Sequence, residues 1–324
     1  MNKPIAPEIS VVVPLHNEEA NIAELYARLR KLMDARNETW ELICVNDGSS
    51  DGTLATLLNL RRADPRVKII NLSRNFGKDI ALTAGIDHAV GDAVIPLDAD
   101  LQDPPELIGE LVDSWRQGHD VVNATRRSRL SDSWLKRTSA AIFYHFLNKI
   151  TVVRIPPNTG DFRLLSRPVV EVLKKMPERA RFMKGLFSWV GFTQGTVYYD
   201  RPPRHAGTST WNYWRLWNFA IDGFTSFSSI PLKVWSYLGL VCSLLSFVYA
   251  GFLILRTIIR GIDLPGYASI MVVMLFLGGV QLISLGVVGE YLGRIYDEVK
   301  GRPLYVVRDR YGVEEQESSG SRGA

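Results

Sequence analysis

Three aspartates follow one apolar segment of the sequence within six residues. The segment at 93–97 is followed by Asp98, Asp100 and Asp103, with Gln102 among them. Neighbouring carboxylates repel one another and raise each other's pKa values unless a cation neutralises them. Mg2+ and Mn2+ prefer carboxylate, amide and water oxygens, and substrate phosphates often complete their coordination. We therefore predict a divalent-metal site, for Mg2+ or Mn2+, made by Asp98, Asp100 and Gln102.

Asp103 has a structural interpretation instead. It stands directly before Pro104 and Pro105, and an aspartate followed by prolines is typical of a helix N-cap. We therefore predict that Asp103 caps a helix, and we leave it out of the metal site.

A second acidic loop, VNDGSSDGT at 45–53, contains Asp47 and Asp51. Asp47 could form an Asx turn before a helix, or it could bind a ligand. A calcium loop of the EF-hand type is excluded, because its twelfth position would be Leu58 instead of glutamate and because a strand precedes it. We favour the ligand role for Asp47, since the loop shares its predicted position with three other polar clusters.

Residues 8–125 alternate between apolar, β-branched runs and segments with helical spacing. This alternation indicates an α/β fold with a mostly parallel sheet that helices cover on both faces. The predicted strands are 9–15, 40–46, 67–72, 93–97 and 120–125, and the predicted helices are 18–35, 53–62, 78–90 and 104–117. Ligands of such sheets bind beyond the carboxyl ends of the strands. The polar clusters at these ends predict one shared site: HNEE at 16–19, NDGSSDG at 46–52, SRNFGK at 73–78 and DADLQD at 98–103.

Several classes of protein are excluded. No G-x-G-x-x-G follows the first strand and no G-x-x-x-x-G-K-[ST] is present, which argues against a Rossmann dinucleotide site and a P-loop. The net charge of +4, from 38 basic and 34 acidic residues, is too small to indicate nucleic-acid binding. We expect no disulfide between Cys44 and Cys242, and the first residues lack the apolar stretch of a secretory signal. The first domain is therefore expected in the cytosol.

Two long segments near the C-terminal end contain no charged residue. They lie at 234–255 and 264–289, and each exceeds the roughly 20 residues that cross a bilayer. The alternative is a pair of buried helices in a soluble domain, but two adjacent runs of this length favour membrane spanning. We predict transmembrane helices at about 233–256 and 265–290.

Aromatic and basic residues flank these segments. Trp235 and Tyr237, with Tyr291 and Tyr296, fit aromatic belts. More basic residues follow the second span than lie in the loop between the spans. The positive-inside rule then predicts a multi-pass protein of the cell inner membrane with both termini in the cytoplasm. The small residues Gly278 and Gly279 could support a homo-oligomer.

Basic residues cluster after the fifth predicted strand. Arg126, Arg127 and Arg129 could form a solvated face, but arginine suits bidentate phosphate binding. Amphipathic, aromatic-rich segments at 133–150 and 211–230 follow in the sequence. They could be ordinary core-facing helices, but basic residues beside them favour helices that lie on a membrane surface.

One further segment and one further residue are candidates for the site. NTGDFRLLSR at 158–167 is predicted to hold Asp161 and Arg163 in a glycine turn. Lys78 either contacts a bound nucleotide or is solvent-exposed at the start of a helix.

The motifs together resemble a known family. VVVPLHNEEANI, VNDGSSDGT, SRNFGKDIALTAG and DADLQDPPE, followed by a two-helix anchor, look like family 2 glycosyltransferases of the GT-A fold. Within that family they are most similar to the branch of dolichyl-phosphate mannose synthases and bactoprenol glucosyltransferases. Each motif alone is modestly specific, but four motifs in order with the anchor are highly specific, and the match covers most of the chain.

The resemblance implies roles for the site residues. The base and ribose of a nucleotide-sugar would be held by Pro14, Leu15, Glu18 and Asp47, with Lys78, Asp98 and Ala99 completing the donor site. The metal at Asp98, Asp100 and Gln102 would bridge the donor diphosphate. Asp161 would lie near the anomeric carbon as base or orienting group. The loop at 201–210 resembles the family's Arg-x-x-Gly-x-Ser loop, so Arg204 and Ser209 join the three arginines as ligands of the acceptor phosphate. His205 is a weaker candidate.

We therefore expect an inverting, metal-dependent transfer of one hexose to a polyprenyl phosphate at the cytoplasmic face of a membrane. UDP-glucose and undecaprenyl phosphate are favoured, while a UDP-4-amino-4-deoxyarabinose derivative and GDP-mannose stay open as donors. A processive polymer synthase is disfavoured because the family's Q-x-x-R-W element is missing. A non-catalytic scaffold that retains the fold is the remaining alternative.

The expected organisation has four parts. A cytosolic GT-A domain covers 1–210, an interfacial helix 211–230, the two membrane helices 231–292, and a cytosolic tail 293–324 whose end is polar and expected to be disordered.

Overall fold

The structure is a computed structural model that describes residues 7–127, 159–176, 178–179, 183–200, 230–260 and 266–313. These residues fall into two compact units. The first, called the sheet unit below, contains the described residues up to 200 together with 303–313. The second, called the hairpin unit, contains 230–260 and 266–302. The interfacial helix predicted at 133–150 lies outside the described residues, as does the one predicted at 211–230 except for its last residue, which begins α9.

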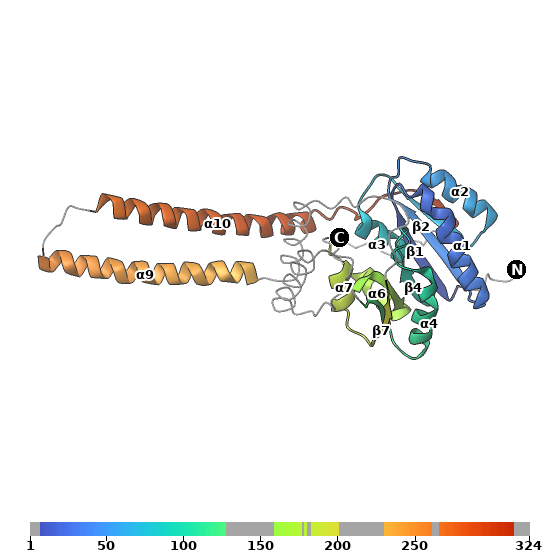
Figure 1. The fold of residues 1–324 in the computed structure, drawn as a ribbon. Coiled ribbons are helices and arrows are strands. Elements are labelled where there is room, and N and C mark those ends of the chain that lie inside the picture. Colours follow the sequence, from blue (N-terminus) through green and yellow to red (C-terminus); the bar gives the residue numbers. More distant parts are fainter. Residues whose placement is uncertain are drawn as a thin grey trace, which may run out of the picture. The chain divides into compact units, whose positions relative to one another are not determined.

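The sheet unit is built on one eight-stranded sheet with the order β7-β5-β6-β4-β1-β2-β3-β8. Figure 1 labels β1, β2, β4 and β7 of this sheet. β1 pairs in parallel with β2 and β4, β2 with β3, and β5 with β7. β6 runs antiparallel to β4 and β5, and β8 runs antiparallel to β3. The strands are Ile9–Leu15, Trp40–Asn46, Val67–Leu72, Ala93–Pro96, Val121–Arg126, Thr159–Ser166, Gln194–Tyr199 and Val307–Tyr311 for β1 to β8. The mostly parallel α/β fold is therefore confirmed.

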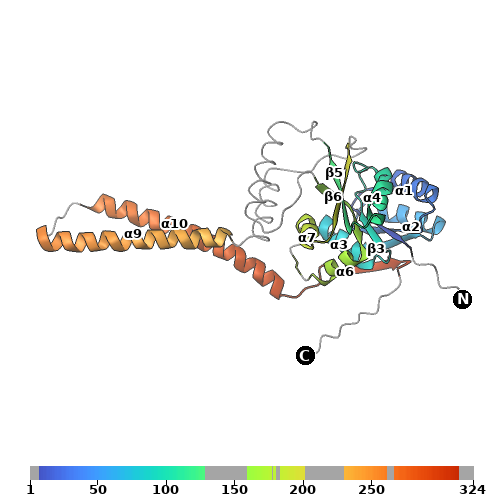
Figure 2. The same ribbon diagram turned by 90° about the horizontal axis from the view of Figure 1, so that it is seen from below.

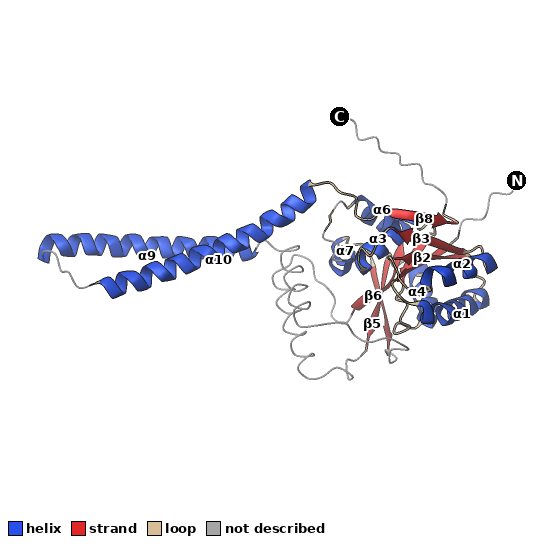
Figure 3. Ribbon diagram, turned by 90° about the horizontal axis from the view of Figure 1, so that it is seen from above, coloured by secondary structure: helices blue, strands red, loops and turns tan. Residues whose placement is uncertain are grey.

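Helices cover both faces of this sheet (Figure 3). They are α1 Glu19–Ala35, α2 Thr53–Ala63, α3 Lys78–His88, the 3-10 turn η1 Pro105–Leu107, α4 Ile108–Arg116, α6 Arg167–Lys175 and α7 Met183–Trp189. The predicted strands and helices between 9 and 126 are confirmed, with end points that differ by a few residues. Parallel strands buried on both faces produce the continuous apolar runs that made these elements recognisable.

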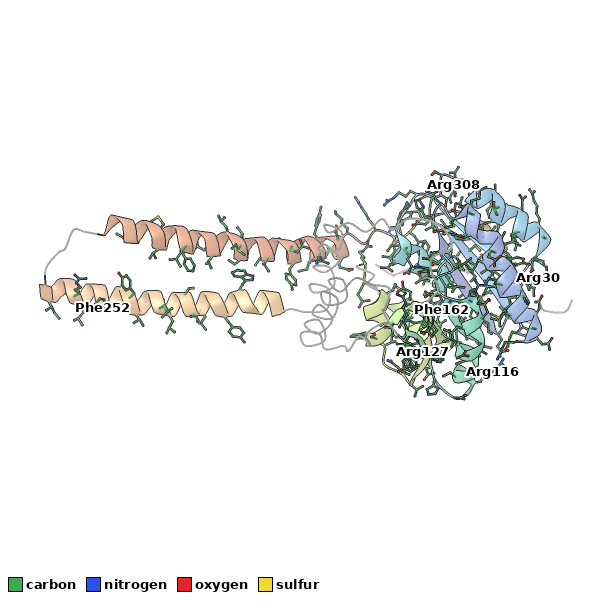
Figure 4. The ribbon with its side chains drawn as sticks, viewed as in Figure 1. Arg30, Arg116, Arg127, Phe162, Phe252 and Arg308 are labelled. Atoms are coloured by element: carbon green, nitrogen blue, oxygen red, sulfur yellow. The ribbon has the colours of Figure 1, made fainter. Side chains whose placement is uncertain are left out.

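The alternation of side chains along β1 explains how the helices pack. Val11 and Val13 lie in the core that the apolar side chains of α1 and α4 complete. Val12 faces the other way, where α3 approaches so closely that Gly85 lies against its side chain. Successive residues of a strand point to opposite faces, so one short run supplies both cores. Phe162 of β6, labelled in Figure 4, is also buried in the first core.

Three strands, β6, β7 and β8, were not predicted from the sequence. β6 contains Asp161 and Arg163, so the predicted glycine turn at this position is wrong. Glycine and aspartate are disfavoured in strands, but pairing on both sides with β4 and β5 overrides that local preference. β8 lies within the segment predicted to be a cytosolic tail, and it pairs with β3 at the edge of the sheet (Figure 3).

The hairpin unit consists of α9 Ile230–Arg260 and α10 Tyr267–Val299, which contact each other (Figure 2). Many of their large apolar side chains are exposed, including Phe252, which is 57% exposed (Figure 4). Exposed apolar surface of this extent marks a binding or membrane surface. By length and composition, one segment of the described residues, Phe276–Val299, is long and apolar enough to cross a membrane, and Gly239–Tyr249 is a shorter apolar stretch.

The close approach of α3 to the sheet predicts the effect of Gly85→Ala. A Cβ atom at Gly85 would lie 2.2 Å from Cγ1 of Val12 and 3.1 Å from Cγ2 of Val45. Helix propensity alone would favour alanine by about 1 kcal/mol, but overpacking a core costs about 1–3 kcal/mol. We expect a lower thermal midpoint for Gly85→Ala, and recovery in the double variant Gly85→Ala/Val12→Ala relative to Val12→Ala alone. Simple addition of the two single effects would contradict this packing.

Candidate active site

The carboxyl ends of the central strands lie level with one another. In the pairing register, Leu15 at the end of β1 lies opposite Asn46, and Asn46 at the end of β2 lies opposite Asn71. The polar loops that follow these strands therefore begin at one edge of the sheet. Hydrogen bonds and ion pairs join all four loops, as described below, so the prediction that the four clusters share one place is confirmed.

Asp47 organises this edge. Its side chain is buried. Oδ1 accepts the backbone N–H of Phe76 at 2.7 Å, and Oδ2 accepts that of Gly77 at 2.9 Å. Gly77 has a φ of 98°, a conformation that favours glycine. Asp47 thereby fixes the turn between β3 and α3 and the position of Lys78, the first residue of α3. A carboxylate accepts about four hydrogen bonds, so the predicted contact with a nucleotide stays possible.

The loop after β1 is tied to the loop after β2. The backbone N–H of Asn17 donates to Oγ of Ser49 at 3.0 Å, and Oδ1 of Asn17 accepts the N–H of Ser50 at 2.8 Å. The N–H of Glu18 donates to Oγ1 of Thr53 at 3.0 Å. These bonds hold the HNEE and NDGSSDG clusters as one structure.

The residues predicted to hold the base and ribose differ in exposure. Pro14 and Glu18 are half-buried, and the Glu18 carboxylate accepts Nδ2 of Asn21 at 2.6 Å. The side chain of Leu15 belongs to the core, while its carbonyl accepts the N–H of Asp47 at 2.8 Å. Leu15 could therefore reach a ligand through its backbone only. The nucleotide contacts of all three residues stay predictions.

Lys78 joins two carboxylates that are far apart in the sequence. Its Nζ lies 2.8 Å from Asp98, which follows β4, and 2.7 Å from Oδ2 of Asp161 in β6. The exposed fractions of the three side chains are 45% for Lys78, 26% for Asp98 and 15% for Asp161. The ammonium group is thus the cation that two neighbouring acids require.

The pKa values reflect this arrangement. Burial would lower the pKa of Lys78, but the charges of Asp98 and Asp161 outweigh it and raise this pKa. Burial raises the pKa of Asp98; Lys78 opposes this, while Asp161 and Asp103 raise it further. The edge therefore has a concentration of negative charge that favours cations.

The rest of the DADLQD cluster forms a tight turn. Oδ1 of Asp100 accepts the backbone N–H of Gln102 at 3.1 Å, and Leu101 between them has a φ of 57°. Ala99 is buried. Among the residues that the structure describes, no three acidic, histidine or cysteine side chains group closely enough to hold a metal ion. A cation here would need oxygen atoms from a substrate as well, so the metal site of Asp98, Asp100 and Gln102 stays a prediction.

Asp103 does not cap a helix, so that prediction is wrong. The first turn after it is the short η1, whose cap position is Pro104 without a side-chain bond. The buried carboxylate of Asp103 instead accepts a hydrogen bond from the hydroxyl of Tyr199 in β7. Arg126 lies beside the pair, with Nε 3.3 Å from the Tyr199 hydroxyl and Nη2 3.9 Å from Asp103. The sequence gives no sign of Tyr199, because its contact with Asp103 depends on the pairing of β7 with β5.

The predicted phosphate ligands are only partly described. Arg126 is mostly buried beside Tyr199, and Arg127 is 63% exposed, with Nη1 3.9 Å from Asp200. Figure 4 labels Arg127. Arg126 is the last residue of β5 and Arg127 follows it, at the carboxyl edge of the sheet. Arg129, Arg204, His205 and Ser209 lie outside the described residues.

Arg163 lies behind Asp161. It is buried, its Nη2 donates to the carbonyl of Gly160 at 2.7 Å, and its guanidinium stacks 4.4 Å from the ring centre of Phe187. Burial lowers the pKa of Arg163 to about 10, although Asp161 opposes this shift. Its Nε has no hydrogen-bond partner within the described part of the chain. Arg163 thus fixes the backbone that presents Asp161.

Comparison with known protein families agrees with this geometry. Residues 10–173 match the family described as Glycosyl transferase family 2, and residues 230–295 match the GtrB C-terminal hairpin. The chain belongs to glycosyltransferase family 2. The resemblance seen in the sequence motifs and the GT-A-type fold are thereby confirmed.

Relatives of this family 2 glycosyltransferase match it over nearly their whole length. An uncharacterized glycosyltransferase of Synechocystis sp. (strain ATCC 27184 / PCC 6803 / Kazusa) is 61% identical over 307 residues, covering 95% of this chain and 96% of that protein. The SfII prophage-derived bactoprenol glucosyl transferase of Shigella flexneri is 50% identical over 301 residues, covering 93% and 97%. A prophage bactoprenol glucosyl transferase homolog of Escherichia coli (strain K12) is 48% identical, covering 93% and 98%.

Contact between the loops at the active edge predicts a specific effect of Gly48→Ala. Gly48 has a φ of 63°, and a Cβ atom there would lie 2.4 Å from the backbone N of Asn75. Gly118 has a φ of 99° but open space around it, so Gly118→Ala is a matched control. Both variants incur the roughly 1–2 kcal/mol cost of a left-handed alanine. Gly48→Ala alone adds a backbone clash of about 1–3 kcal/mol, so we expect its thermal midpoint to fall further. Equal midpoints would contradict the contact between the two loops.

Proposed function

We propose that this glycosyltransferase moves one glucosyl residue from UDP-glucose to a polyprenyl phosphate at the cytoplasmic face of the inner membrane. One geometric observation carries the reaction: Lys78 holds Asp98 of the predicted donor site together with Asp161, the residue predicted to lie near the anomeric carbon. The substrate class is supported by relatives near 50% identity that are named bactoprenol glucosyl transferases.

The donor side suits a divalent cation. The candidate ligands are oxygen atoms of Asp98, Asp100 and Gln102, which are the hard donors that Mg2+ and Mn2+ prefer. Lys78 already stands as a cation against Asp98, which supports the fit. When bound, the ion would neutralise the diphosphate of the departing nucleotide. Asp47 and the loops that it orders would hold the nucleoside end.

The acceptor side needs little proton transfer. A phosphate monoester has a second pKa of about 6, so it is largely dianionic at neutral pH. One of its oxygens would attack the anomeric carbon as the bond from that carbon to the diphosphate oxygen breaks, with inversion. Asp161, fixed from behind by Arg163, would orient the reacting groups. Arg126 and Arg127, with Arg129, Arg204 and Ser209, would bind the acceptor phosphate, since catalysis here rests on positioning and charge stabilisation.

The hairpin unit would bring this site to its lipid substrate. Its match to the GtrB C-terminal hairpin and its exposed apolar side chains support a membrane anchor. We propose that both helices span the inner membrane and that both termini are cytoplasmic, in keeping with the basic residues after the second helix.

Label transfer tests the reaction. Purified full-length protein in detergent receives undecaprenyl phosphate, Mn2+ or Mg2+, and in turn labelled UDP-glucose, a UDP-4-amino-4-deoxyarabinose derivative and GDP-mannose. We expect label from UDP-glucose to enter the organic phase and EDTA to abolish this transfer. Asp98→Asn should be inactive, while Asp113→Asn, which removes an exposed carboxylate of α4, should retain activity. Transfer from another donor would contradict glucose as the sugar that is transferred. Transfer in the presence of EDTA would contradict the metal dependence. No transfer from any donor would favour the scaffold alternative.

Stability measurements can test, without an activity assay, whether Lys78 balances the charges of Asp98 and Asp161. Lys78→Met removes the ammonium group that lies between Asp98 and Asp161. We therefore expect a lower thermal midpoint in metal-free buffer, and a free energy of unfolding lower by roughly 1–2 kcal/mol for this half-exposed group. The further change Asp161→Asn removes the repulsion and should restore stability. Lys31→Met is the surface control, because Lys31 is exposed on α1. A Lys78→Met protein as stable as wild type would show that the two acids need no counter-ion.

A further inference from the structure

The last described strand, β8, is the outermost strand of the sheet beside β3, whose carboxyl end leads into the candidate active site. β8 follows the hairpin unit in the sequence, yet it pairs with β3 of the sheet unit (Figure 3). In this pairing Asp309 lies opposite Asn71, and the backbone N–H of Ser73 donates to the carbonyl of Val306 at 2.9 Å. The segment is therefore held against the end of β3, where the loop that leads to Lys78 begins.

A chain of side-chain hydrogen bonds runs inward from β8. Nδ2 of Asn71 donates to Oδ2 of Asp309 at 2.8 Å, and Nδ2 of Asn46 donates to Oδ1 of Asn71 at 2.8 Å. Oδ1 of Asn46 accepts the backbone N–H of Ser49 at 3.4 Å. Asn46 and Asn71 are buried, while Asp309 is partly exposed at the outer end.

Asp309 gives this chain its direction. An ionised carboxylate only accepts hydrogen bonds, whereas an asparagine amide donates from one side and accepts on the other. Because Asp309 accepts a hydrogen bond from Nδ2 of Asn71, the side-chain oxygen Oδ1 of Asn71 must face Asn46. The amide of Asn46 then turns its own oxygen toward the loop at 47–49. Asn46 and Asn71 are both buried, so water cannot freely replace these hydrogen bonds. If either amide were turned around, two donors or two acceptors would face each other, which costs free energy.

We propose that Asp309 is a positioning residue for the donor nucleotide. It sets the orientation of Asn71 and Asn46 and so the loop that contains Asp47, which in turn holds the turn before Lys78. This inference rests on the proposed function, because it takes that loop to be the nucleotide-binding one. It adds a contribution to donor binding from a segment that follows the hairpin.

A purely structural attachment of β8 is the alternative, and the chain offers a matched control for it. The hydroxyl of Tyr305 donates to Oδ2 of Asp87 in α3 at 2.9 Å, which ties the same segment to the sheet unit at another point. Tyr305→Phe therefore weakens the attachment without touching the chain from Asp309 to Asn46. A structural role of β8 would make both variants behave alike.

The experiment measures nucleotide binding by full-length wild type, Asp309→Ala, Asp309→Asn and Tyr305→Phe in detergent. UDP and GDP are titrated calorimetrically, each with Mn2+, and thermal midpoints and the kinetics of sugar transfer are recorded. We expect Asp309→Ala to weaken UDP binding about fivefold or more, the loss typical of one hydrogen bond that positions a site, and to raise KM with little change in kcat. Asp309→Asn should recover part of the affinity, since its amide oxygen can still accept from Asn71. Tyr305→Phe should lower the thermal midpoint and leave the affinity within twofold.

The outcomes separate this inference from the proposed function. Wild type that binds UDP, with Asp309→Ala binding it equally well, overturns the positioning role alone. Equal losses of affinity in Asp309→Ala and Tyr305→Phe also overturn it, because attachment of the strand would then explain both. Wild type that binds neither UDP nor GDP overturns the nucleotide-sugar function and this inference with it.

Discussion

The arrangement of this enzyme depends on one electrostatic constraint, the presence of two carboxylates at a single edge of the sheet. Asp98 follows β4 and Asp161 lies in the neighbouring strand β6, and the charges of the two carboxylates must be balanced by a cation. Lys78 supplies it because Asp47 fixes the turn from which α3 begins. The conformations of the loops after β1, β2, β3 and β4 therefore depend on one another. A protein that retained the fold without these charges would have no need of such a network.

The sequence predicted most of the framework and the place of the site. Strands β1 to β5 are recognisable because parallel strands buried on both faces leave continuous apolar runs, and the polar clusters after them mark the carboxyl edge. β6, β7 and β8 were not predicted. The residues of β6 and β8 read locally as turn and tail, because Asp161 and Asp309 are strand residues only through their pairing with distant segments, and β7 is likewise defined by its pairing with β5. The partners of Lys78 and Asp103 were unpredictable for the same reason. They lie tens of residues away, and no local pattern links them.

Several buried polar groups near this site form hydrogen bonds with other polar groups of the site. Arg163 supports the backbone beside Asp161, Tyr199 satisfies Asp103, and Asn71 satisfies Asn46. A buried polar group without partners costs free energy, whereas a fully bonded network becomes rigid. The candidate catalytic carboxylates are thus held by a preorganised network, which suits the proposed reaction, in which positioning contributes more than proton transfer.

The place of β8 in the sequence also determines when the sheet can be completed during synthesis. A ribosome makes β1 to β7 first, then the hairpin, and only afterwards the strand that covers β3. Until then β3 is an edge strand with unpaired backbone groups, which is a hazard for aggregation. A chain that stops before or within the hairpin keeps this open edge. Completion of the glycosyltransferase sheet is therefore coupled to production of the hairpin, so that a finished sheet belongs to a chain whose hairpin has already been made.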